Sequence, residues 1–306
     1  MSIREKRLMQ SKISLGTVQF GLDYGIANKN GKVSRQKVFE IFKYAKASGI
    51  NSLDTAYAYG QSEEVIGAYL KQHPDQFQVV SKLPSLDAYI PGKAEEFLQL
   101  TLNRLNIKRL HGYLIHNVEN FFTYEDLWEE LVCLKGKSRI DRIGFTLYSP
   151  MELETLLEKN IEFDLIQIPY SIFDRRFEKY FDILKKRRVE IHVRSVFLQG
   201  LVFLKPDDLQ GNLLKAQKQI NDLRKLSQDH NVSISAICLN FVLLNKCVDK
   251  VVIGIDNLDH LRKNMKSLAL FNRINQLGQE LNNLIIHDEN ILMPFKWHLE
   301  DRKRKK

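Results

Sequence analysis

The sequence has little cysteine, and its cysteines are not spaced as a site would need. The 306 residues include only Cys133, Cys238 and Cys247. They form no CxxC pair, and an odd number cannot all pair within one chain, which argues against a disulfide framework and against a cysteine-based metal site. We expect all three to be reduced packing residues.

Long apolar runs are also missing. No stretch approaches the roughly 18 consecutive apolar residues of a membrane span, and residues 1–12 lack the apolar core of a signal peptide. Hydrophobic residues make up 44% and charged residues 27%, the balance of a globular protein with a substantial core. We therefore expect a cytoplasmic protein with no membrane partner.

Positive charge is in excess but is not concentrated. The formal net charge of +9 is spread along the chain, and its one dense run, 302–306, lies at the end, where we expect a solvated tail. A nucleic-acid partner would call for a recognition fold or aromatic-rich basic stretches, and neither is evident. Nucleic-acid binding is therefore the weakest of the functional alternatives.

Several motifs that would define a site are absent. The glycines of 16–25 are too widely spaced for the GxGxxG turn of a doubly wound dinucleotide-binding sheet. The chain also lacks HExxH, a Cys/His cluster and GxSxG. The sequence thus favours neither a metal site nor a serine hydrolase.

What the chain does contain is a repeated alternation of short and long apolar patterns. The short runs are rich in β-branched residues and are typical of buried parallel strands, whereas the longer ones have helical periodicity. The predicted strands are 13–16, 50–54, 78–82, 112–116, 140–144, 165–168, 190–194 and 251–254. The predicted helices include 34–48, 63–71, 93–105, 124–135 and 233–244.

Eight such units need roughly 250 residues when they close into a barrel. The chain is long enough for this and shows no low-complexity linker between domains. We predict an α/β fold, a (β/α)8 TIM barrel that forms a single domain over 1–306. Residues 272–306 would be a C-terminal extension that ends in the basic tail.

Polar residues stand where most of these strands end, which is the end of a barrel that carries its chemistry. They are Asp54, Lys82, His116, Thr146, Gln167 and Arg194. Chance is the alternative explanation, since loops begin at the same places. Their order along the chain, however, matches a known family.

Three segments carry the resemblance: LDTAYAYGQSE at 53–63, VVSK at 79–82 and YLIHN at 113–117. On these residues the chain resembles the aldo-keto reductase superfamily, from about residue 14 to about residue 264. The resemblance implies a catalytic set of Asp54, Tyr59, Lys82 and His116.

In that set Tyr59 would be the proton donor for carbonyl reduction and the base for oxidation. An ammonium at Lys82 would lower the tyrosine pKa from its usual value of about 10, and Asp54 would hold that ammonium in place. His116 would orient the carbonyl oxygen. The alternative role of Lys82 is a Schiff base, which the Asp and Tyr partners disfavour. Ser62 suits a helix N-terminus better than catalysis.

The resemblance also implies a nicotinamide cofactor. Its predicted contacts are Gly16, Thr17, Thr146, Gln167, Arg194, Ser195, Leu198, Gly200, Gly254, Asp256, His260 and Asn264. Arg194 occupies the place of the aromatic residue that stacks on the nicotinamide, and a planar guanidinium can also stack. NADP(H) is the expected cofactor, but a carboxylate at Asp256 would repel a 2′-phosphate, which keeps NAD(H) open as an alternative.

The predicted function is NAD(P)H-dependent reduction of an aldehyde or ketone to an alcohol. Asp23, Tyr24, Tyr57 and Asn117 are the predicted substrate-pocket residues, with Tyr57 as a wall of the pocket. The polarity of the other three favours a small, sugar-like carbonyl substrate. The alternative is a redox-sensing or regulatory subunit that binds the cofactor with little turnover. The natural substrate, working direction and oligomeric state do not follow from the sequence.

Overall fold

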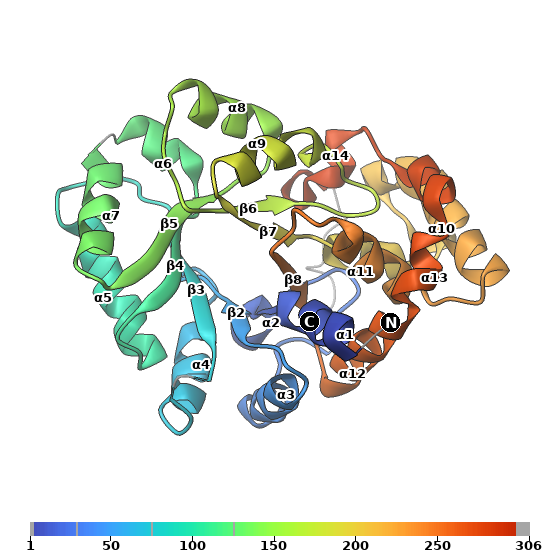
Figure 1. Ribbon diagram of the computed structural model, residues 1–306, viewed down its shortest axis with the longest axis horizontal. Coiled ribbons are helices and arrows are strands. Elements are labelled where there is room, and N and C mark those ends of the chain that lie inside the picture. The colour runs from blue at the N-terminus through green and yellow to red at the C-terminus, as the bar shows by residue number, and fades with distance from the viewer. Residues whose placement is uncertain (1–2, 29, 75, 125, 298–306) are drawn as a thin grey trace.

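Eight parallel strands form the centre of the molecule in a computed structural model that describes residues 3–28, 30–74, 76–124 and 126–297 (Figure 1). Each strand pairs with its neighbours in sequence, and β8 pairs back onto β1 to close the barrel. The strands are β1 (Ile13–Gly16), β2 (Ser52–Asp54), β3 (Gln78–Leu83), β4 (Leu110–Ile115), β5 (Ile140–Thr146), β6 (Leu165–Pro169), β7 (Glu190–Arg194) and β8 (Lys250–Gly254). The predicted single-domain TIM barrel is confirmed.

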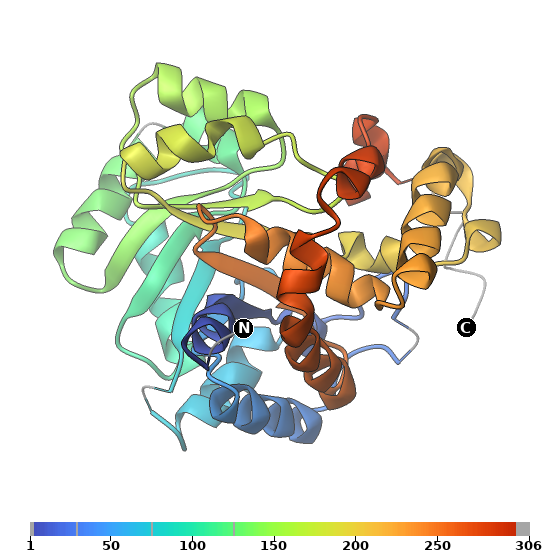
Figure 2. The same cartoon turned by 45° about the vertical axis from the view of Figure 1, so that its right-hand side comes forward.

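Helices surround the barrel, as the second view makes clear (Figure 2). Those that follow strands and lie outside them are α3 (Arg35–Ala47), α4 (Ser62–Leu70), α5 (Lys93–Leu105), α7 (Asp126–Gly136), α8 (Pro150–Glu158), α9 (Phe181–Lys186), α11 (Ile234–Leu244) and α12 (Leu258–Ser267). Additional helices are α1 (Ile3–Lys12), α2 (Val18–Gly21), α6 (Val118–Thr123), α10 (Gln217–Asp229), α13 (Phe271–Asn275) and α14 (Glu289–Leu292). None of the helices in the described ranges is long and apolar enough to cross a membrane.

Backbone hydrogen bonds explain where the predicted strand ends were wrong. β2 begins two residues later than predicted because the Ile50 amide donates to the Ala45 carbonyl and so closes the end of α3. β4 begins two residues earlier because the Leu110 amide bonds to the Arg139 carbonyl. The apolar pattern of a sequence predicts which side chains are buried. The residue at which a strand begins depends instead on which carbonyl group its amides meet in the folded chain.

The hydrophobic core has two parts. Inside the barrel, Val80, Leu114 and Leu165 form a small cluster of fully buried side chains. A much larger cluster fills the space between the barrel and the helices. The interior is thus packed below the carboxyl ends of the strands, the end at which barrels of this kind carry their sites.

At the amino end of the strands the interior holds an ionic cluster. The Glu190 carboxylate lies 2.7 Å from His192 Nε2 and 3.1 Å from His111 Nε2, and it also pairs with Arg142. His192 is fully buried, and its Nδ1 has no partner among the described residues. The side chains of Glu190, His192 and His111 lie close enough together to hold a metal ion, but the neighbouring guanidinium of Arg142 already neutralises the carboxylate.

The C-terminal extension folds back onto the barrel as α13, α14 and short 3₁₀ turns. The Ile286 amide donates to the Phe173 carbonyl, and the Trp297 indole donates to the Ile291 carbonyl at 2.8 Å. Phe295 packs edge-on against Tyr148, which follows β5. The basic run 302–306 lies outside the described residues.

The three cysteines are free, but they do not share one environment. Cys238 is fully buried in α11, as expected of a packing residue. Cys133 is exposed, so the expectation of a packing role is wrong there.

Candidate active site

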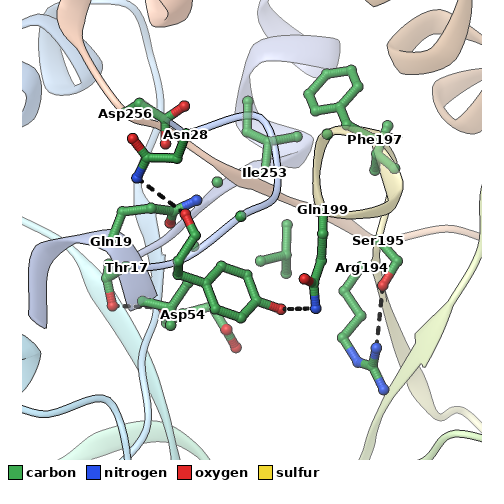
Figure 3. A pocket seen from close by; sticks show the side chains of 18 of the residues that line it. Thr17, Gln19, Asn28, Asp54, Arg194, Ser195, Phe197, Gln199, Ile253 and Asp256 are labelled. Carbon is green, nitrogen blue, oxygen red and sulfur yellow. Dashed lines mark hydrogen bonds between the residues drawn. The ribbon is translucent and has the colours of Figure 1, made fainter. Parts of the chain in front are cut away.

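A cavity of about 530 Å³ opens at the carboxyl ends of the strands (Figure 3). It extends from the ends of β2, β5 and β6 to the end of β8 and the first turns of α12. Its lining includes Asp54, Tyr59, His116, Thr146, Gln167, Arg194, Gly254, Asp256, His260 and Asn264. Residues from loops and strands far apart in the sequence therefore share one space.

A buried ion pair lies at the bottom of this cavity. Lys82 Nζ is 2.9 and 2.8 Å from the two carboxylate oxygens of Asp54 and donates to the Thr55 carbonyl at 2.8 Å. Gln167 donates to the same carboxylate at 2.6 Å. The side chain of Lys82 is only 1% exposed, so the three oxygens of Asp54 and Thr55 replace the water that its charge has lost.

Tyr59 lies above this pair on the loop that follows β2. Lys82 Nζ is 5.1 Å from the centroid of the tyrosine ring, and the His116 ring meets that ring edge-on at 6.0 Å. The loop also packs against α2, where a Cβ added at Gly21 would lie 1.8 Å from the Tyr59 carbonyl oxygen. A glycine at this position therefore permits the close approach that places Tyr59 over the cavity.

The expectation that the pKa of Tyr59 is lowered is wrong. Burial, reinforced by the negative charge of Asp54, raises the pKa of Tyr59 well above its usual value. The ammonium of Lys82 is paired with Asp54, and its Nζ lies over the tyrosine ring. Tyr59 is thus held in its protonated form at neutral pH.

His116 is also held in a single protonation state. Burial, together with the positive charges of Lys82 and Arg194, lowers its pKa to about 4. The imidazole is therefore neutral near pH 7 and carries one N–H donor.

Ser62 does not act as the predicted helix cap. It is the first residue of α4, and its hydroxyl donates to the Thr17 carbonyl at 2.9 Å while also lying 2.8 Å from Thr17 Oγ1. Thr17 in turn donates to the Asp54 carbonyl at 2.9 Å. The serine therefore links the loops after β1 and β2 and fixes the backbone at Asp54.

Eleven of the twelve predicted cofactor residues line the cavity, and Leu198 is the exception. Leu198 is 1% exposed and begins a 3₁₀ segment whose first three residues, 198–200, have positive φ. Its side chain packs into the core, and the loop presents Gln199 and Gly200 to the cavity instead. Sequence alignment to a motif identified the loop but not which of its side chains face the ligand.

Of the predicted substrate residues, the structure places only Tyr24 in the cavity lining. Tyr57 turns outward, where its ring contacts Phe97 and lies 4.1 Å beneath the Arg104 guanidinium. Asn117 caps α6 and accepts from the Glu119 amide. Both assignments to the pocket are therefore corrected.

Asp23 is likewise placed differently from the prediction. It is exposed, and its carboxylate accepts from the Lys32 amide. It therefore shapes its own loop. With Asp23 and Asn117 outside the lining, the polarity that favoured a sugar-like substrate is largely lost.

Sequence reasoning missed several residues of the cavity: Gln19, Asn28, Tyr148, Phe197, Gln199, Phe203 and Lys263. Gln19, Gln199, Phe203 and Lys263 lie in helical segments, and the other three lie on loops. Gln199 and Lys263 stand directly beside predicted cofactor residues, but nothing local marked them as facing the cavity. Gln199 donates to the Tyr24 hydroxyl at 2.7 Å, which joins two loops across the cavity (Figure 3). Such a contact between residues 175 positions apart has no local signal.

The cavity fits a dinucleotide in shape and in chemistry. It reaches from the strand ends to α12, and its wall carries the buried Gln19 Oε1, which has no hydrogen-bond partner in the described chain. Lys263 and the amino end of the ten-residue helix α12 border its far end, where phosphate groups are favoured.

Comparison with known proteins agrees with this geometry. The family model of the Aldo/keto reductase family matches residues 12–277. The chain is 26% identical over 298 residues to the NADH-specific methylglyoxal reductase of Escherichia coli, covering 85% of this chain and 90% of that protein. It is 23% identical over 277 residues to the uncharacterized oxidoreductase YqkF of Bacillus subtilis, covering 84% and 90%.

Among solved structures, the aldo-keto reductase AKR11C1 from Bacillus halodurans in its holo form superposes with a TM-score of 0.70. The alignment covers 89% of this chain and 91% of that one at 21% identity, which supports the fold. The chain belongs to the Aldo/keto reductase family. This membership makes it an oxidoreductase and supports carbonyl reduction as its general reaction.

Proposed function

We propose that the protein reduces an aldehyde or ketone to an alcohol with a reduced nicotinamide dinucleotide and with Tyr59 as proton donor. The observation that carries this proposal is the stack at the inner end of the cavity. There the Asp54–Lys82 pair lies beneath Tyr59, and His116 stands beside it. When bound, the cofactor would supply the hydride.

The protein's own residues supply the proton and the orientation. Because the pKa of Tyr59 is raised, its hydroxyl keeps the proton until a carbonyl oxygen becomes basic enough to take it. The neutral His116 can donate a hydrogen bond to the same oxygen and so fix the carbonyl against Tyr59.

We propose that Thr146, Gln167 and Arg194 contact the nicotinamide end of the cofactor. Gly16, Thr17, Ser195 and Gly200 would lie along its middle, and Gly254, Asp256, His260 and Asn264 at its adenosine end. Each lines the cavity. The choice between NADPH and NADH would rest on Asp256, which lies 3.7 Å from His260 Nδ1 and offers a carboxylate to a ribose hydroxyl.

The test is a fluorescence titration of the purified protein with NADPH and NADH. Nicotinamide oxidation is then followed across methylglyoxal, simple aldehydes and keto-sugars. Tyr59→Phe should bind cofactor as the parent does and lose most turnover, roughly 10²–10⁴-fold, because general acid catalysis is removed. Failure to bind either cofactor would refute the proposal, and cofactor binding without turnover would favour a regulatory subunit.

A further inference from the structure

Arg194 places an unpaired positive charge at the inner end of the cavity. Within the described ranges it forms no ion pair with a carboxylate, and its two hydrogen bonds go to neutral acceptors. These are Ser195 Oγ at 3.2 Å and the Leu147 carbonyl at 2.9 Å. A guanidinium has five N–H donors, so most of them remain available to a ligand.

The guanidinium is held in place rather than free in solvent. It lies 4.3 Å above the centroid of the Tyr148 ring, and Phe295 packs edge-on against that ring from the C-terminal extension. Arg176 donates to the Tyr148 carbonyl at 3.2 Å. Arg194 is therefore half-buried and preorganised, and its position costs no further ordering when a ligand binds.

Charges on the other inner residues cancel or are absent. Lys82 and Asp54 neutralise each other, and His116 is neutral near pH 7. Asp256 lies at the opposite end of the cavity, beside His260. Among the described residues the inner end thus carries a surplus positive charge, and a half-buried charge of this kind calls for an anionic partner.

We propose that Arg194 binds the carboxylate of the substrate, so that the enzyme acts on carbonyl compounds that also carry a carboxylate. The inference rests on the function proposed above. A planar guanidinium matches a carboxylate with two parallel hydrogen bonds, and such charge-assisted pairs are the stronger ones.

The cofactor's diphosphate is the other anion that could meet this charge. The guanidinium, however, extends from β7 to the loop after β5, where it contacts Leu147 and Tyr148. The diphosphate forms the middle of the cofactor, which the proposed function places along Gly16, Thr17, Ser195 and Gly200. Leu147 and Tyr148 instead follow Thr146, a proposed contact of the nicotinamide end. The substrate is therefore the better match for Arg194.

The experiment compares ω-oxo carboxylates of two to five carbons with their neutral methyl esters, which are nearly the same in shape. For the parent protein kcat/KM should be about 10- to 100-fold higher for the best acid than for its ester, the range of a hydrogen bond to a charged group. Arg194→Gln should bring this ratio close to one, and Arg194→Lys should retain part of it. The exposed Arg187, at the end of α9, provides the matched control, because Arg187→Gln removes the same charge away from the cavity.

Circular dichroism and thermal unfolding establish that the variants fold, and a fluorescence titration measures their affinity for NADH and NADPH. If the parent protein has the same kcat/KM for each acid as for its methyl ester, the proposal is wrong. It is also wrong if Arg194→Gln weakens cofactor binding but keeps the acid-to-ester ratio, because the charge would then serve the diphosphate. Turnover of the methyl esters tests the general function separately, since it does not need the carboxylate.

Discussion

Asp54→Asn tests whether the charges of Asp54 and Lys82 compensate each other in the buried pair beneath Tyr59. The substitution keeps the shape of the side chain but removes the charge that faces Lys82 Nζ at 2.8 Å. With side-chain exposures of 1% and 4%, neither partner can recover its hydration. Breaking such a pair by removing one charge costs about 3–5 kcal/mol.

This loss converts into a measurable shift in melting temperature. At about 2.1 cal/mol/K of unfolding entropy per residue, 306 residues give about 0.6 kcal/mol/K, so Tm should fall by about 5–8 °C. The assay is thermal unfolding followed by circular dichroism at pH 7. Asp207→Asn, on an exposed turn, is the control, and its free energy of unfolding should change by about 0.5 kcal/mol or less.

A second variant separates the pair's charge from its packing. Asp54→Leu combined with Lys82→Met replaces both charges with apolar groups of similar size and should recover most of the lost stability. The reasoning is refuted if Asp54→Asn melts within about 1 °C of the parent. It is also refuted if the double variant loses more stability than Asp54→Asn and Lys82→Met combined.

Three further predictions concern pH and cofactor choice. Because the pKa of His116 is about 4, its imidazole stays neutral between pH 5.5 and 8, and its titration should not change kcat/KM for reduction in this range. An inflection near pH 6.5 that disappears in His116→Gln would contradict this. Asp256→Ala should shift the NADPH-to-NADH ratio of kcat/KM toward NADPH by about tenfold if one charge repels the 2′-phosphate, and an unchanged ratio would exclude that role. Burial raises the pKa of Glu190, but hydrogen bonds from His111 and His192 outweigh burial and lower it overall. The stability that this carboxylate contributes is therefore present above its unfolded pKa of about 4.5 and lost as pH falls below it. Glu190→Gln should have a lower Tm than the parent at pH 7, and its Tm should fall less between pH 5 and pH 3. Parallel plots of Tm against pH for the two proteins would refute this.

The sequence by itself determined the architecture. Alternating strand and helix patterns predicted the eight-unit barrel, because burial on both faces of a parallel strand leaves a continuous apolar run that local reading can detect. The order of Asp54, Tyr59, Lys82 and His116 likewise indicated residues that would meet, since all four lie at or after the carboxyl ends of neighbouring strands.

Only the tertiary structure decided the direction of side chains and the balance of charges. Tyr57 and Tyr59 share one loop, yet one ring packs against α5 and the other faces the cavity, because side-chain direction in a loop follows contacts distant in sequence. The rise in the pKa of Tyr59 has the same origin: desolvation depends on how many atoms surround the hydroxyl, which no local pattern records. The unpaired charge of Arg194 could be recognised only once the described carboxylates had all been placed and none was found to face it.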